Sequence, residues 1–265
     1  GTVGGVDKMN MRNVNIVARY ESKLLRRDIV FLGFVVIALV GISLWQMIKQ
    51  GRVNVFWYKV ALPSSFPFFS MYYYNLVQVL IALFVCMEVV YRERKKDAME
   101  VFLCRPFRNS EYCIGRFLGI FRMFLFVNIC VLLVCMYINL WVVGAPFNVW
   151  IYVFYLFTLS IPTLIFVLGC ALSISAMVKN RPLSVLVLGL FGLGVYFYLD
   201  EWQFGAFDFW GRNLPNMFSD VVGHPDLKGY LLHRLTYTGL GVAGVLFWVA
   251  NMKRLRDHKE HQGLQ

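Results

Sequence analysis

Long apolar runs alternate with short polar segments along this chain of 265 residues. Each run is close to the about 20 residues that an α-helix needs to cross the hydrocarbon core of a membrane. The runs are apolar all round rather than striped, which is typical of helices surrounded by lipid or by other helices. The pattern predicts six transmembrane helices, at Ile29–Ile48, Met71–Tyr91, Phe117–Val143, Trp150–Val178, Pro182–Leu199 and Leu231–Met252.

The composition supports the same fold class. Hydrophobic residues make up 59% of the chain and charged residues only 15%. A soluble domain of this length buries its core with much less apolar sequence. We therefore expect an all-α integral membrane protein, in which residues 29–252 form a six-span transmembrane domain.

The distribution of charge predicts the orientation. The formal net charge is +11, which on a soluble protein would suggest a nucleic-acid partner. Here most of the Lys and Arg residues lie before the first predicted span and after the second, fourth and sixth, which follows the positive-inside rule. We expect both termini in the cytoplasm, a basic cytoplasmic tail at residues 253–265, no nucleic-acid partner, and a multi-pass location in the bacterial cytoplasmic (inner) membrane.

The N-terminal region predicts a helix on the membrane surface. Residues 13–28 have an apolar face beside a basic face, so we expect an amphipathic interfacial helix with membrane lipids as partners. The apolar face comprises Ile16, Val17, Tyr20 and Leu24, and the basic face Arg19, Lys23 and Arg26. A cytoplasmic extension of the first span is the alternative. Residues 1–12 are interpreted as a flexible N-terminus or a remnant of cloning.

The outer segment at residues 200–230 mixes acidic residues with many aromatic rings. This aromatic loop predicts short interfacial or re-entrant helices, and it favours an amphiphilic or lipid-attached cargo. We expect no disulfide and no metal site, because the cysteines fall within spans or in a segment predicted to be cytoplasmic, with no histidine nearby. They are Cys86, Cys104, Cys113, Cys130, Cys135 and Cys170.

A densely charged segment, residues 92–116, separates the second and third predicted spans. Asp97 and Glu100 fit a capping box, which predicts a short helix from Ala98 to Cys104. Pro106 should end that helix, because the residue before a proline disfavours the α conformation. The helix has an apolar side that needs cover from lipid, from other spans or from a partner protein. The alternative is a simple solvated positive-inside loop.

The pattern Glu-Arg-x-x-Asp-x-Met-Glu-x-x-Leu-x-x-Pro-x-x-x-x-Glu-x-x-x-Gly-Arg-Phe-Leu-Gly runs from Glu93 to Gly119. It resembles the signature of the ABC-2 type permeases, the membrane subunits of ABC exporters. Asp97 and Ala98 depart from the Gly-Thr that is common in that family. The positions that match are Glu93, Arg94, Met99, Glu100, Leu103, Pro106, Glu111, Gly115 and Arg116.

The resemblance implies that this segment is a cytoplasmic coupling helix, which docks in a groove of separate ABC ATP-binding subunits. It also implies a second permease subunit, identical or related. The coupling residues that it implies are Glu93, Arg94, Asp97, Met99, Glu100, Phe102, Leu103, Arg105, Pro106 and Glu111. The chain has no phosphate-binding loop of its own. We therefore expect no enzyme activity from this chain alone and no cofactor in it, with ATP and Mg bound by the partner ATPase.

Two charged residues fall inside predicted spans, Glu88 near the end of the second and Arg122 near the start of the third. Intramembrane charges are candidates for function. We expect the two to form an intramembrane pair, with gating and substrate contact as alternatives. The other polar residues of the spans, Asn75, Gln78, Asn128 and Asn139, look too scattered along the sequence to define a site.

Two other classes of protein stay open. One is an ATPase-independent secondary transporter or an integral membrane enzyme, although the sequence offers no convergent set of acid, base and nucleophile. The other is a non-transporting membrane scaffold that recruits an ATPase. The hypothesis that accounts for most of the pattern is a permease subunit of an ABC-2 type exporter.

Overall fold

The computed structural model describes residues 9–50, 65–93, 108–141, 146–178, 180–199, 207–211 and 223–262. Within these ranges the regular elements are helices, and no strand is present. In chain order they are α1 (Met11–Leu25), α2 (Ile29–Gln50), α3 (Ser65–Glu93), α5 (Asn109–Trp141), α6 (Val149–Tyr155), the π-helical turn η2 (Leu156–Ser160), α7 (Ile161–Met177), α8 (Arg181–Gly194), the π-helical turn η3 (Val195–Leu199) and α10 (Leu227–Gln262).

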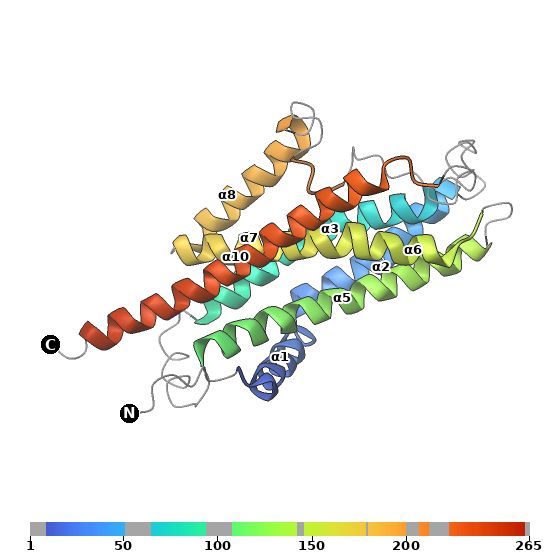
Figure 1. Cartoon of the computed structure of the whole chain (residues 1–265). Helices are drawn as coiled ribbons and strands as arrows, with labels where there is room; N and C mark the ends of the chain where they lie inside the picture. Colours follow the sequence, from blue (N-terminus) through green and yellow to red (C-terminus); the bar gives the residue numbers. More distant parts are fainter. Residues whose placement is uncertain are drawn as a thin grey trace.

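The long helices form one elongated bundle (Figure 1). Helices α2, α3, α5, α6–α7 and α10 run roughly along a common axis, and α1 lies across one end of it. Five stretches are long and apolar enough to cross a membrane: Ile29–Gln46, Phe66–Tyr91, Asn109–Trp141, Val149–Met177 and Leu227–Met252. The prediction of a multi-pass, all-α membrane protein is confirmed at the level of these five helices.

The predicted fifth span, Pro182–Leu199, takes a different form. It corresponds to a shorter apolar helix, Arg181–Phe197, whose regular α-helical part α8 has 14 residues. Figure 1 shows α8 leaning away from the bundle. Gly189 and Gly194 have open space where a side chain would start, so no helix packs closely on these two glycines among the described residues.

The N-terminal helix has clear boundaries. It begins where the Asn10 side chain accepts a hydrogen bond from the backbone N–H of Arg12 at 3.0 Å, a standard N-cap. It ends at Leu25, three residues earlier than the sequence pattern predicts. Asp28 then caps α2 by accepting from the N–H of Val30 at 2.8 Å. The two caps make α1 a separate element rather than an extension of the first span.

The fourth predicted span contains an irregular turn next to Pro162. Helix α6 passes through η2 into α7, with Pro162 in the first turn of α7. Proline has no N–H, so the carbonyl of Thr158, four residues earlier, lacks its α-helical donor. Arg234 of α10 supplies one, because its Nε donates to the Thr158 oxygen at 2.7 Å.

Glycines allow the backbones of α7 and α10 to pack closely against each other. A Cβ on Gly241 would lie 2.6 Å from the backbone of Ile165, and one on Gly244 would lie 2.7 Å from the carbonyl oxygen of Gly169. Ser173 Oγ also donates to the Gly244 carbonyl at 3.0 Å. The small residues of α7 and α10 therefore face each other, as in close helix packing within membranes.

Candidate functional site

The candidate site lies where the charged segment joins the bundle. Helix α3 leads into this segment and α5 leads out of it. Most of the implied coupling residues lie outside the described residues: Arg94, Asp97, Met99, Glu100, Phe102, Leu103, Arg105 and Pro106. Glu93 is described only as the last backbone position of α3. The structure therefore describes the base of the segment, to which Glu111 belongs.

Glu111 fastens the start of α5 to the start of α1. Its side chain is buried, and its two oxygens have separate donors. Oε1 accepts from the backbone N–H of Asn10 at 2.6 Å, and Oε2 accepts from Nδ2 of Asn13 at 2.9 Å. Hydrogen bonds to a carboxylate are stronger than neutral ones. The motif glutamate thus holds α1 in position against the base of the charged segment.

Two glycines of the same motif let α1 approach α5 closely. A Cβ on Gly115 would lie 2.7 Å from the Val17 Cβ, and one on Gly119 would lie 2.8 Å from the Ala18 carbonyl oxygen. Both distances are too short for a side chain. Ser22 Oγ also donates to the Gly119 carbonyl at 3.1 Å, so backbone and side chain fix the crossing together.

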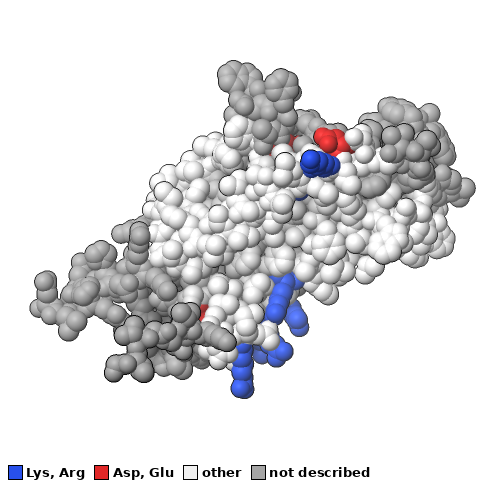
Figure 2. All heavy atoms as spheres, in the orientation of Figure 1, with Lys and Arg blue, Asp and Glu red and all other residues white. Residues whose placement is uncertain are grey.

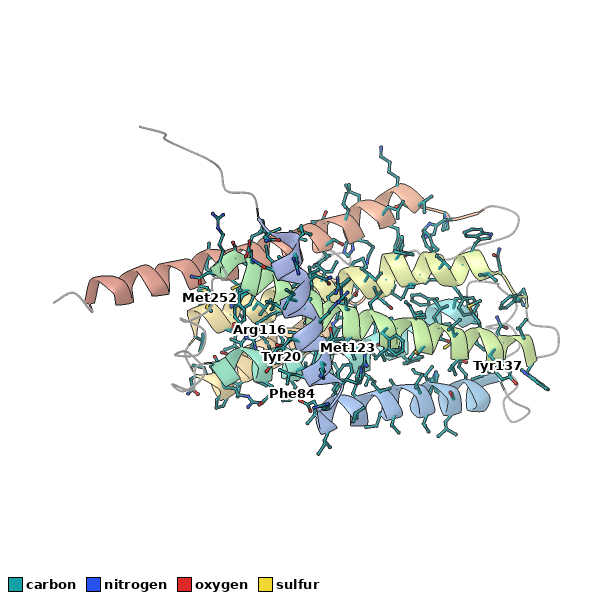
Figure 3. The ribbon with its side chains drawn as sticks, turned by 90° about the horizontal axis from the view of Figure 1, so that it is seen from below. Tyr20, Phe84, Arg116, Met123, Tyr137 and Met252 are labelled. Carbon is teal, nitrogen blue, oxygen red and sulfur yellow. The ribbon has the colours of Figure 1, made fainter. Side chains whose placement is uncertain are left out.

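Arg116 connects three helices at this base. Its Nε donates to Oε2 of Glu21 on α1 at 3.2 Å, and its Nη2 donates to the carbonyl oxygen of Val89 on α3 at 3.2 Å. The Arg116 and Glu21 side chains are 6% and 3% exposed. Figure 3 shows Arg116 beside α1, where α1 crosses the long helices. Removing one member of such a pair leaves a buried charge and costs about 3–5 kcal/mol.

The end of α3 is also tied to the other side of the bundle. The Tyr91 hydroxyl donates to the carbonyl oxygen of Val178, just after α7, at 2.7 Å. It lies 2.9 Å from Ser184 Oγ on α8. Glu88 forms an ion pair with Arg181, the first residue of α8, at 2.5 Å. A displacement of the end of α3 would therefore reach α7 and α8 as well as α1.

The expected Glu88–Arg122 pair is replaced by two separate interactions. Glu88 pairs with Arg181, whereas Nη1 of Arg122 donates to Oδ1 of Asn15 on α1 at 2.9 Å. The physical reason is the direction in which each side chain leaves the α5 helix. Arg122 lies six positions after Arg116, so the two point about 120° apart on α5, and only Arg116 faces α3. Arg122 is exposed.

Three amide side chains that the sequence left scattered meet inside the bundle. Gln78 Nε2 donates to Asn75 Oδ1 at 3.2 Å, and Asn128 Nδ2 donates to Gln78 Oε1 at 2.5 Å. All three side chains are fully buried. Asn75 Nδ2 and Asn128 Oδ1 have no hydrogen-bond partner among the described residues. The i, i+3 spacing of Asn75 and Gln78 was visible in the sequence, but the register of α3 against α5 was not.

Arg234 is a further residue that sequence reasoning missed, because it was counted with the outer loops. Its side chain is almost completely buried. Besides Thr158, it donates to the carbonyl oxygens of Phe209 and Leu159, both at 2.9 Å, and to Thr163 Oγ1 at 2.6 Å. The signal that could have found it is a lone arginine inside an apolar run.

In the described part of the chain, no three His, Cys, Asp or Glu side chains gather in a way that could hold a metal ion. The thiols of Cys86, Cys130, Cys135 and Cys170 form no disulfide there. Comparison with protein-family models gives no match, and comparison with curated proteins gives none either.

Proposed function

We propose that this chain is the permease subunit of an ABC-2 type exporter, which couples ATP hydrolysis by a separate subunit to movement of cargo across the membrane. The observation that carries the proposal is the position of Arg116. It joins α1, α3 and α5 at the base of the segment whose sequence resembles a coupling helix. A mechanical input at that segment needs such a rigid attachment to the spans.

The contacts define a route for that input. Glu111 and the close packing at Gly115 and Gly119 attach α1 to α5, and Arg116 adds α3. From the end of α3, Tyr91 continues the route to α7 and α8. Motion of residues 94–107 by an ATPase would then move these helices together rather than bend one of them.

The proposed assembly contains two permease subunits, identical or related, and two ATP-binding subunits that hold ATP and Mg. It includes α8 and η3 as a sixth crossing and places both termini in the cytoplasm. The aromatic outer segment favours an amphiphilic or lipid-attached cargo.

The test is purification of the full chain from its native membrane in a mild detergent. We expect an ATPase subunit in about equal amount, and we expect Glu100→Arg to lower the ATPase activity of the complex without loss of the chain from the membrane. Lys228→Glu, at the opposite end of the bundle, is the control. A chain that purifies without any ATPase contradicts the proposal and favours an ATPase-independent transporter or enzyme.

The scaffold alternative predicts a different pattern. A scaffold would still recruit the ATPase, but inverted vesicles containing the complex would accumulate no lipid-attached or amphiphilic compound from a membrane extract when ATP is added. ATP-dependent accumulation that Glu100→Arg abolishes supports the permease.

A further inference from the structure

Helix α1 has three distinct faces. The first is buried against α5 and contains Val14, Val17, Ala18, Glu21 and Leu25. The second is apolar but exposed, with Ile16 at 47% and Tyr20 at 61% exposure. The third is basic and exposed, and it contains Arg12, Arg19, Lys23 and Arg26. Figure 2 shows Lys and Arg side chains gathered on the side of the molecule where α1 lies.

Three described carboxylates near α1, those of Glu21, Asp28 and Glu111, already have other partners. Glu21 is paired with Arg116, Asp28 caps α2, and Glu111 accepts from Asn10 and Asn13. Among the residues with described side chains, none forms an ion pair with the bases of α1. Clustered like charges repel one another, so this face favours a negatively charged partner.

Arg122 of α5 adds to the same cluster. Its guanidinium donates to Asn15, which lies one helical turn before Arg19 on α1. A guanidinium has five N–H donors, and the described bond uses one of them. Arg122 is exposed although it belongs to a stretch long and apolar enough to cross a membrane. Such a side chain is expected to reach the level of the lipid headgroups.

We propose that Arg122 and Arg19, assisted by Lys23, bind the phosphate of an anionic lipid headgroup at the crossing of α1 and α5. The planar guanidinium fork matches phosphate geometry. Two guanidinium groups from different helices form a defined binding site rather than a nonspecific positive surface. The exposed Ile16 and Tyr20 next to these bases are suited to the acyl chain of the same lipid. A purely acidic protein surface would neutralise the bases but would leave the exposed side chains of Ile16 and Tyr20 without an apolar partner.

The orientation of α1 supports a lipid over a protein. Figure 3 shows α1 crossing the long helices at a steep angle, close to one end of the bundle. If the long helices cross a membrane, α1 lies near the plane of its surface, where amphipathic helices meet anionic lipids. This proposal does not depend on the coupling function, because it uses only the membrane-crossing direction of the bundle.

The test uses the full chain in nanodiscs of dioleoyl phosphatidylcholine with increasing fractions of dioleoyl phosphatidylglycerol. Native mass spectrometry counts the retained phosphatidylglycerol, and the midpoint of thermal unfolding is followed in parallel. We expect one tightly retained phosphatidylglycerol and a midpoint that rises with its fraction. Inorganic phosphate at the same concentration should not reproduce the rise, because it lacks the acyl chain.

The variants R19Q and R122Q should each lower retention about tenfold, which corresponds to one charge-assisted contact of about 1.4 kcal/mol. Glutamine removes the charge of Arg122 but keeps an amide N–H donor, and the unfolding midpoint of each variant in pure phosphatidylcholine shows whether the fold is kept. K228Q removes one exposed charge at the other end of the bundle and should behave as the wild type. Unchanged retention in both variants overturns the proposal. The proposal is also overturned if R19Q or R122Q loses an acidic protein that co-purifies with the wild type while lipid retention stays unchanged. That result would show that the basic face of α1 binds a protein.

Discussion

Arg116 of α5 and Glu21 of α1 form a buried ion pair at the base of the charged segment, with Nε and Oε2 3.2 Å apart. The two residues are far apart in the sequence, and neither belongs to a recognisable pair by spacing. The same guanidinium donates to the Val89 carbonyl on α3. The relationship makes α1 part of the bundle rather than a separate surface helix, and it gives a first quantitative prediction.

Glu21→Met should destabilise the protein by about 3–5 kcal/mol, because Arg116 would be left as a buried charge without its carboxylate. Arg116→Met should cost a similar amount. The double variant Glu21→Met/Arg116→Met should be more stable than either single variant, since no unpaired charge stays buried. Thermal unfolding of the three variants in detergent measures this double-mutant cycle. Strictly additive losses would contradict the pair.

Gly241→Ala should destabilise the protein by about 1–3 kcal/mol, because the new Cβ would overlap the backbone of Ile165. Gly239→Ala is a matched control on the same helix, where nothing lies within 4 Å of the added atom. There the loss of glycine's unfolded-state entropy should stabilise the helix by about 0.5–1 kcal/mol. Unfolding midpoints that shift in opposite directions confirm the packing, and equal shifts contradict it.

Arg234→Met should loosen the part of the bundle around η2, since four acceptors would lose a charged donor. Hydrogen bonds to charged groups contribute about 1.5–3 kcal/mol each, so a loss of several kcal/mol is expected.

Pro162→Ala restores an N–H that can reach the Thr158 carbonyl. When Pro162→Ala is already present, Arg234→Met should therefore cost about 1 kcal/mol less, because one orphaned acceptor has regained a donor. Thermal unfolding of the single and double variants measures the difference, and an equal cost in both backgrounds would contradict the described contact.

Gln78→Leu should cost more stability than Asn75→Leu. Gln78 bonds to both neighbouring amides, so its loss leaves Asn75 Oδ1 unsatisfied and takes an acceptor from Asn128. Asn75→Leu breaks one bond and also removes an already unpaired Nδ2. An unsatisfied buried polar group costs about 1–3 kcal/mol, so a difference of that order is expected in unfolding midpoints. The reverse order would contradict the described network.

The α1–α5 crossing can be checked by chemical labelling. Gly119→Leu should push α1 away, because the Cβ would lie 2.8 Å from the Ala18 carbonyl. A cysteine placed at Ala18, which is fully buried, should then react with a membrane-permeant maleimide. It should stay protected with Gly33→Leu, which adds the same side chain where nothing lies within 4 Å. Protection in both backgrounds would argue against the crossing.

Much of the architecture could be read from single segments. A run of about 20 apolar residues predicts a span because crossing a bilayer depends on length and composition, which are local properties. Asn10, Asp28 and Pro162 likewise act on neighbouring residues, although the sequence pattern placed Asn10 in a flexible N-terminus and did not identify the two caps. The shorter α8 shows the limit, since an apolar run alone does not decide how much of it continues as a regular α-helix.

Which residues meet was decided only by the tertiary structure. Glu88 forms an ion pair with Arg181, and Arg122 donates a hydrogen bond to Asn15. The two do not pair with each other because the rotation of α5 about its axis directs Arg116, and not Arg122, toward α3. Three amides that look scattered form one buried network through the register of α3 and α5. A sequence determines the length and polarity of each helix, which depend on nearby residues. Rotation and register depend on packing between distant segments, for which a single sequence carries no local signal.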